Sequence, residues 1–160
     1  MKAVLTILFA SYILPQASPT LQLRGAQRPA HATVLAGPTG LGVRAGERVS
    51  LFVDVTPNPN IHVYAPGSKD YIPITVKVEA QPSIKVGKIT YPKSEMMTFA
   101  DERVPVFQKP FRLTQELAIN GSVKPGATLP ITGTVNYQAC DDKVCYPPET
   151  APVAWTLTVR

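Results

Sequence analysis

The chain has 160 residues, 44% of them hydrophobic, which is enough for one domain with an ordinary core. Its formal net charge of +5 is spread along the chain, without a basic run or interleaved basic and aromatic residues. This composition argues against nucleic-acid binding, and we interpret the charge as a contribution to solubility.

The N-terminus resembles a secretory signal peptide. Lys2 supplies a positive charge, and the stretch from Ala3 to Leu14 is uncharged and too short to span a bilayer. We expect a signal peptide over residues 1–20, a leader or linker over 21–30, and one domain over 31–160. The protein is then periplasmic or otherwise extracytoplasmic, where disulfides persist. The alternative is a retained N-terminal anchor.

Beyond the leader, 17 Pro and 10 Gly fall at intervals along the chain, which favours short strands joined by turns over long helices. Several segments alternate apolar and polar residues, such as 49–55, where the odd positions are apolar. We expect strands at residues 31–35, 48–55, 72–79, 84–91, 111–119, 129–137 and 153–159. Residues 58–67 and 93–105 are predicted to be longer loops.

Seven short strands at near-regular spacing predict an all-β fold, an immunoglobulin-like antiparallel β-sandwich. Two distant cysteines around a tryptophan, the antibody signature, are absent, so packing must hold the two sheets together. We expect Trp155, Phe52 and Phe111 in the core.

The two cysteines, Cys140 and Cys145, are close together near the end of the chain. A disulfide between them closes only a few residues, so it adds at most roughly 2 kcal/mol to stability. Because both thiols belong to one local turn, the bond can open and close without unfolding the domain. A redox pair is therefore favoured, and a permanent local disulfide is the alternative.

The residues around the cysteines indicate how such a pair would react. Asp141 and Asp142 follow Cys140 directly, and Lys143 offsets them only in part. Negative charge disfavours a thiolate, so neither cysteine is expected to be a standing nucleophile. The pair is better suited to accept attack from a partner's thiolate and then to reduce a substrate disulfide.

The segments VNYQAC at 135–140 and CYPPET at 145–150 resemble the active-site segment of the N-terminal periplasmic domain of the thiol:disulfide interchange protein DsbD family. That domain is immunoglobulin-like and needs no cofactor beyond its disulfide. It takes electrons from membrane-embedded and thioredoxin-like parts of the same protein. It then reduces periplasmic partners, including cytochrome c maturation thioredoxins and disulfide isomerases.

The resemblance implies a protein-disulfide reductase component in an electron-transport chain. Since the chain ends shortly after Cys145, we expect the thioredoxin-like donor and the membrane electron-transfer protein to act in trans. We expect the protein itself to be a monomer. Four residues separate the cysteines here, against five in the best-known members of the family. Cys145 is expected to form the mixed disulfide with a partner.

The resemblance also implies a lining and a cap for the cysteine pair. His62 and Tyr64 match a segment whose aromatic residue packs beside the cysteines. Residues 93–99 match a cap loop that shields the pair, with Met96 at the cap position and Phe99 close by. Tyr137 and Tyr146 complete the expected lining. Each tyrosine could equally be an ordinary sandwich aromatic, and His62 a structural histidine.

Two other function classes stay open. The two cysteines with Met96, Met97 and His62 could form a soft site for Cu(I), which thiolate and thioether ligands suit. A non-catalytic interaction module with a structural disulfide is the other class, since a sandwich fold does not imply catalysis.

Overall fold

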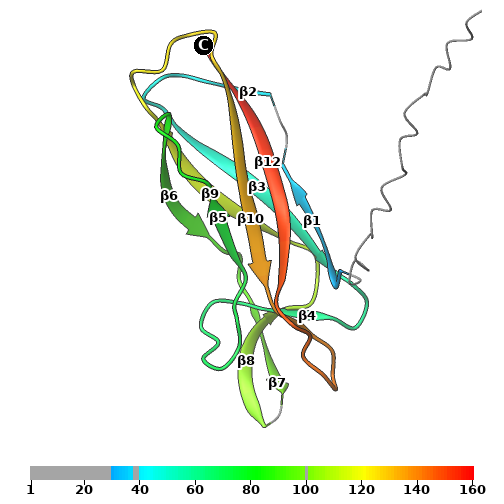
Figure 1. Cartoon of the computed structure of the whole chain (residues 1–160). Helices are drawn as coiled ribbons and strands as arrows, with labels where there is room; N and C mark the ends of the chain where they lie inside the picture. The colour runs from blue at the N-terminus through cyan, green and yellow to red at the C-terminus, as the bar shows by residue number, and fades with distance from the viewer. Residues whose placement is uncertain (1–29, 38–39, 100) are drawn as a thin grey trace, which may run out of the picture.

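The computed structural model describes residues 30–37, 40–99 and 101–160 (Figure 1). The predicted signal peptide and nearly all of the predicted leader lie outside these ranges. The described residues form strands and turns without a helix, which confirms the all-β class.

The strands are arranged in three sheets of four (Figure 1). The first has the order β1-β3-β9-β6, the second β2-β12-β10-β5, and the third β11-β4-β8-β7. The bounds are β1 Ala32–Ala36, β2 Leu41–Val43, β3 Arg48–Pro57, β4 His62–Tyr64, β5 Thr75–Val78, β6 Ile84–Thr90, β7 Glu95–Phe99, β8 Glu102–Phe107, β9 Phe111–Ile119, β10 Thr128–Tyr137, β11 Ala139–Cys140 and β12 Glu149–Val159.

The first two sheets pack face to face and enclose the main core, which confirms the immunoglobulin-like sandwich. Alternate residues of β3, β9, β10 and β12 are buried, as expected when one face of each strand points inward. Trp155 is 2% exposed, and its indole Nε1 donates a hydrogen bond of 3.0 Å to the backbone oxygen of Phe52 on the opposite sheet. This bond ties the two sheets together.

The expected core members divide in two groups. Trp155 is buried, and Phe111 packs at the core's edge, stacked on Phe107 at 4.1 Å between ring centroids. The prediction for Phe52 was wrong, because its side chain lies on the outer face of β3, with the guanidinium of Arg112 5.1 Å from its ring centroid. Phe52 is at an even position of a strand whose odd positions face inward.

The seven expected strands correspond to β1, β3, β5, β6, β9, β10 and β12, with shifted ends. The strand predicted at 72–79 is shorter than expected, since β5 starts at Thr75, two residues after Pro73, which cannot donate a ladder hydrogen bond. The short β2 was not predicted, and it pairs in parallel with β12.

The two segments predicted as long loops contain the third sheet. Residues 58–67 include β4, and residues 93–105 include β7 and most of β8. These strands extend the molecule beyond the sandwich, at the end opposite the C-terminus (Figure 1). β4 is too short to show a period, and in β8 Pro105 interrupts the pattern, so alternation gave no usable signal.

Candidate redox site

A disulfide joins Cys140 and Cys145 at the end of the molecule formed by the third sheet. Cys140 ends β11, and the two cysteines form an antiparallel bridge around a tight turn. The Asp141 carboxylate accepts hydrogen bonds from the backbone nitrogens of Lys143 and Val144 at 2.7 and 2.8 Å. The turn is therefore closed by its own hydrogen bonds as well as by the disulfide.

The two sulfur-bearing residues differ in exposure. Cys140 is completely buried, whereas Cys145 is exposed. A thiolate approaching from solvent can therefore reach the Cys145 side of the bond, while Cys140 is covered by protein.

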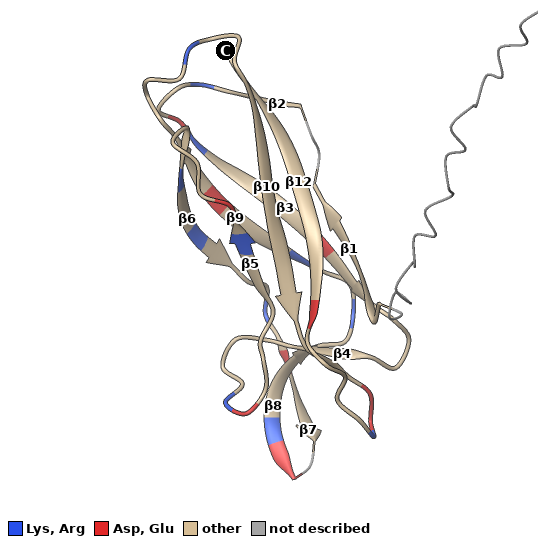
Figure 2. Ribbon diagram, viewed as in Figure 1, with Lys and Arg blue, Asp and Glu red and all other residues tan. Residues whose placement is uncertain are grey.

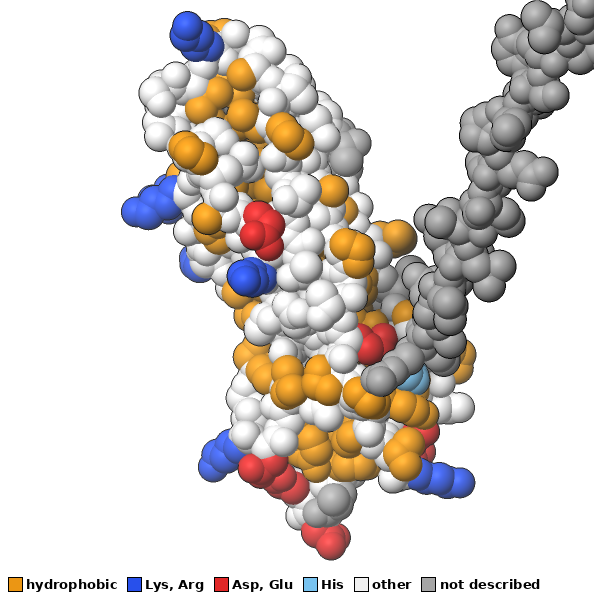
Figure 3. All heavy atoms as spheres, in the orientation of Figure 1, with side chains coloured by type: hydrophobic (Ala, Val, Ile, Leu, Met, Phe, Trp, Pro, Cys, Tyr) orange, Lys and Arg blue, Asp and Glu red, His pale blue; other side chains and the backbone are white. Residues whose placement is uncertain are grey.

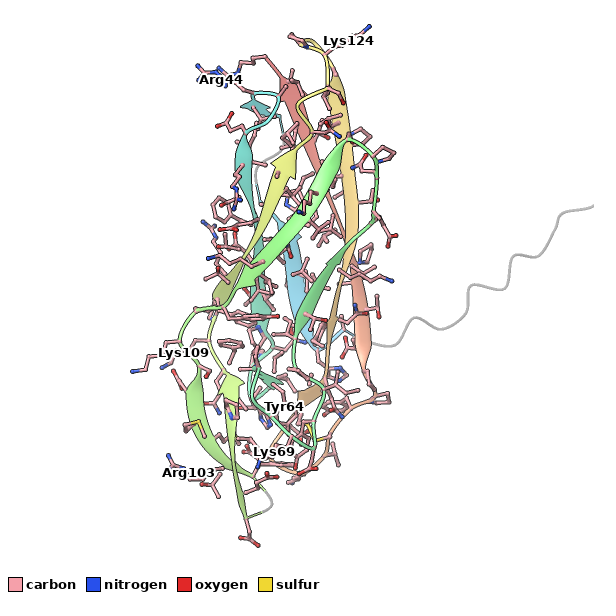
Figure 4. The ribbon with its side chains drawn as sticks, turned by 90° about the vertical axis from the view of Figure 1, so that its left-hand side faces the viewer. Arg44, Tyr64, Lys69, Arg103, Lys109 and Lys124 are labelled. Carbon is pink, nitrogen blue, oxygen red and sulfur yellow. A yellow bond between two sulfur atoms is a disulfide. The ribbon has the colours of Figure 1, made fainter. Side chains whose placement is uncertain are left out.

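Aromatic residues pack against the disulfide. Tyr64 of β4 is fully buried, and its hydroxyl donates to Cys145 Sγ at 3.5 Å. The Tyr64 ring is stacked on Tyr71 at 4.1 Å between centroids, and Tyr71 meets the Phe99 ring edge-on. Figure 4 shows Tyr64 at the third-sheet end of the molecule. We call the four buried residues Tyr64, Val104, Val106 and Cys140 the disulfide cluster, against which Tyr71 and Phe99 pack.

The β7–β8 hairpin supplies the outer wall of the disulfide cluster. Met97 and Phe99 of β7 are partly buried against it, and Gln108 donates to Met97 Sδ at 3.4 Å. Met96, which the sequence placed at the cap position, is 53% exposed and lies outside the cluster. The reason is strand geometry: neighbouring residues of β7 point to opposite faces, so Met97 rather than Met96 faces inward.

His62 is buried on the same side as the cluster. Its ring makes edge contacts with Tyr64 and Phe99, at 5.4 and 5.6 Å between centroids. Burial lowers the pKa of His62, against the opposing effect of Asp142 and Asp141. Its Nε2 atom is buried and has no hydrogen-bond partner among the described residues.

Tyr137 lies away from the disulfide cluster. It is buried in the main core, and its hydroxyl donates to the Glu149 carboxylate at 2.8 Å. Burial, then this hydrogen bond, raise the pKa of Tyr137. The structure thus places Tyr137 with the sandwich aromatics.

Tyr146 lies beside the cysteine turn and packs against the main core rather than in the disulfide cluster. Its hydroxyl donates to the Asp141 carboxylate at 2.7 Å, and its ring is stacked on His31 at 3.7 Å. The hydrogen bond from Tyr146 is the largest of the effects that lower the pKa of Asp141 to about 2. Asp141 therefore carries its negative charge next to Cys140 at any ordinary pH.

Sequence reasoning did not single out Tyr71, Val104 or Val106. The two valines alternate at period two, which is a strand signal, but Pro105 between them concealed it. Tyr71 lies in the connection between β4 and β5, where no local pattern indicates which way a side chain points.

The surface at this end of the molecule mixes apolar and charged residues. Hydrophobic side chains gather over the third-sheet end in Figure 3, and acidic and basic residues surround them in Figure 2. Ile72, Met96 and Val144 are each about half exposed. Within the described ranges, no group of three or more His, Cys, Asp or Glu residues could hold a metal ion. Nor does any helix there have the length and apolarity to cross a membrane.

The fold and the site define a class of protein: an immunoglobulin-like β-sandwich domain with a disulfide at one end, one cysteine buried and the other exposed. The model of the family "Thiol:disulfide interchange protein DsbD, N-terminal" matches residues 36–156. Because the match spans most of the sequence, the chain belongs to this family, whose role is thiol–disulfide exchange. No curated protein sequence matches the chain.

Two solved structures are among those similar to this chain. The N-terminal periplasmic domain of ScsB from Proteus mirabilis has a TM-score of 0.56 at 13% identity, covering 82% of this chain and 47% of the other. The DsbD N-terminal domain of Neisseria meningitidis in its reduced form has a TM-score of 0.48 at 17% identity, covering 71% of this chain and 82% of the other. At these identities the likeness concerns the fold alone.

Proposed function

We propose that the Cys140–Cys145 disulfide is a redox-active centre that takes electrons from a thioredoxin-like donor and passes them to oxidised partner proteins. The observation that carries the proposal is the difference in exposure between the two cysteines. Membership of the DsbD N-terminal family supports it. The periplasmic origin of the ScsB domain supports an extracytoplasmic location.

In the first half-cycle, a donor thiolate attacks Cys145 Sγ. A mixed disulfide forms, the Cys140–Cys145 bond breaks, and Cys140 leaves with the electron pair. The donor's second thiol then attacks the donor sulfur of the mixed disulfide. This step oxidises the donor to a disulfide, and after proton uptake both cysteines of this chain are thiols.

In the second half-cycle, the Cys145 thiolate attacks the disulfide of an acceptor. Cys140 then attacks Cys145, which restores the internal disulfide and releases the acceptor as a dithiol. Cytochrome c maturation thioredoxins and disulfide isomerases are the acceptor classes suggested by the resemblance to DsbD.

The β7–β8 hairpin acts as the shield in this proposal. Met97 and Phe99 cover the disulfide cluster, and a docking partner has to displace them to reach the bond fully. The half-exposed Ile72 and Val144 provide apolar surface beside the exposed cysteine.

The reduction potential of the cysteine pair tests the proposal. Purified protein is equilibrated in dithiothreitol or glutathione buffers, and free thiols are trapped. A potential of about −180 to −270 mV supports an electron relay. A potential well below about −300 mV indicates a structural disulfide, and the protein is then an interaction module.

Trapping of the mixed disulfide gives a second test, with a matched control. Cys140→Ser leaves only Cys145, which is first converted to a mixed disulfide with nitrothiobenzoate. A reduced thioredoxin-like donor with a single cysteine should then displace nitrothiobenzoate and accumulate a covalent complex. Cys145→Ser leaves only the buried Cys140 and should form little or none. Equal complex formation by the two variants contradicts attack at Cys145.

A further inference from the structure

His62 has an unusual position for a structural histidine. It is 1% exposed, and its Nε2 atom lacks any hydrogen-bond partner among the described residues. Leaving a buried polar atom unpaired is unfavourable, so native structures rarely keep one without a use. The neighbours of the ring, Tyr64 and Phe99, offer it only edge contacts.

The residue opposite His62 is Cys140. In the antiparallel ladder between β4 and β11, Cys140 is paired directly with His62. Side chains of directly opposed residues point to the same face, with Cβ atoms about 5 Å apart. Tyr64, two residues from His62 and therefore on the same face, belongs to the cluster around Cys140, while Val63 between them points into the main core.

Cys140 needs a proton acceptor when it works as the resolving cysteine. In the reduced protein its buried surroundings and the carboxylates of Asp141 and Asp142 disfavour the thiolate. Only the thiolate attacks a disulfide. Water has poor access to a fully buried cysteine, so a base within the protein has to remove the proton.

We infer that His62 Nε2 accepts the thiol proton of Cys140 in the step that resolves the mixed disulfide. The inference rests on the proposed function. As the proton moves to Nε2, Cys140 Sγ bonds to Cys145 Sγ, and the bond between Cys145 and the partner sulfur breaks. The partner leaves as a thiolate with the electron pair, and the imidazolium then returns its proton to solvent or to that thiolate. In the reverse direction the imidazolium protonates Cys140 as it leaves.

The other ionisable groups around His62 are a tyrosine of its own strand and two aspartates of the cysteine turn. Tyr64, on the same strand β4, contacts the His62 ring. Burial and the neighbouring Tyr71 raise the pKa of Tyr64. Asp142 and Asp141 act on His62 from the turn, and the pKa of Asp141 is lowered to about 2. The lowered pKa of His62 keeps the imidazole neutral, as a base must be before the proton transfer.

A two-phase thiol assay separates the step assigned to His62 from the step before it. Fully reduced protein is mixed in a stopped-flow instrument with a small deficit of dithiobis(nitrobenzoate), which releases a coloured thiolate. The first release reports attack by Cys145. The second reports attack by Cys140 on the resulting mixed disulfide. The assay is run across the neutral pH range with wild type, His62→Gln, His62→Phe and Val63→Ala.

In the wild type the second phase should rise with pH through a histidine titration below the ordinary value of 6.5 and then level off. In both His62 variants that phase should be slower by about 100-fold and should rise steadily with pH without levelling off. Their first phase should match that of the wild type, which also shows that they are folded. Val63→Ala perturbs the same strand on its other face and should leave both phases unchanged.

Three results overturn the role of His62: unchanged second phases in both His62 variants, equal slowing of both phases, or slowing of the second phase by Val63→Ala. The assay uses chemically reduced protein and no donor. A failed donor reaction or a very low potential therefore counts against the proposed function, whereas the assay judges His62 alone.

Discussion

The hydroxyl of Tyr64 lies 3.5 Å from Cys145 Sγ, so a fully buried aromatic residue holds the exposed half of the disulfide. When the bond opens, the same hydroxyl is placed to donate a hydrogen bond to the Cys145 thiolate. Hydrogen bonds to the charged form of a group favour that form.

Tyr64→Phe removes this donor and keeps the ring. One hydrogen bond to a charged sulfur contributes about 1.5–3 kcal/mol, so the pKa of the Cys145 thiol should rise by about 1–2 units. The pH dependence of the alkylation rate in the Cys140→Ser background measures the pKa of the Cys145 thiol. Tyr91→Phe is the control, because Tyr91 packs against the main core and does not belong to the disulfide cluster. Identical alkylation profiles in the presence and absence of the Tyr64 hydroxyl would show that it does not act on Cys145.

Phe99→Ala should make the disulfide easier to reduce by small thiols. Phe99 makes edge contacts with His62 and Tyr71, and such aromatic pairs are worth about 1 kcal/mol each. Losing both favours opening of the β7–β8 hairpin, and we expect reduction by dithiothreitol to be roughly tenfold faster.

Met96→Ala is the matched control for Phe99→Ala. It shortens a neighbouring β7 side chain that is 53% exposed and lies outside the cluster, so the reduction rate should stay at the wild-type value. If Met96→Ala accelerates reduction as much as Phe99→Ala does, the cap position expected from the sequence is correct and the inward side of β7 is not the shield.

Tyr146→Phe should loosen the cysteine turn. The hydrogen bond from Tyr146 is the largest effect lowering the pKa of Asp141 from 3.8 to about 2. A carboxyl whose pKa is lower in the folded state stabilises the protein above the unfolded value, and this contribution disappears as pH falls from about 4 to about 2. In Tyr146→Phe the pKa of Asp141 should move up toward 3.8.

Carboxyl NMR titration of Asp141 measures this change, and acid unfolding of the two proteins follows its effect on stability. The wild type should be more stable to unfolding than Tyr146→Phe above pH 4, and this difference in stability should disappear between pH 4 and pH 2. An advantage that persists unchanged to the lowest pH would mean that Asp141 does not mediate the effect.

Trp155→Ala should destabilise the sandwich strongly. It removes a buried aromatic and its hydrogen bond to the Phe52 backbone, which should cost about 3–5 kcal/mol in the free energy of unfolding. Phe52→Ala removes an aromatic of the outer face of β3 and should cost distinctly less. Urea unfolding measures both, and equal losses would contradict the assignment of Phe52 to the outer face.

The sequence by itself was sufficient to predict the β-sandwich fold and the position of the cysteine pair near the end of the domain. Period-two alternation over long strands such as β10 and β12 marks which residues face inward, because each strand has one face on the core. The YQAC and CYPP segments were enough to suggest the family. The signal was local in each case, so it could be read without knowing what packs against it.

Only the tertiary structure shows which side chains face the disulfide cluster and which face solvent. β4 is three residues long, and β7 lies in a segment read as a loop, so no period showed that Met97 rather than Met96 faces the cluster. The unpaired Nε2 of His62 and its position opposite Cys140 depend on the pairing of β4 with β11. These two strands are far apart in the chain. Tertiary packing, rather than the neighbouring sequence, determines which of their residues face each other.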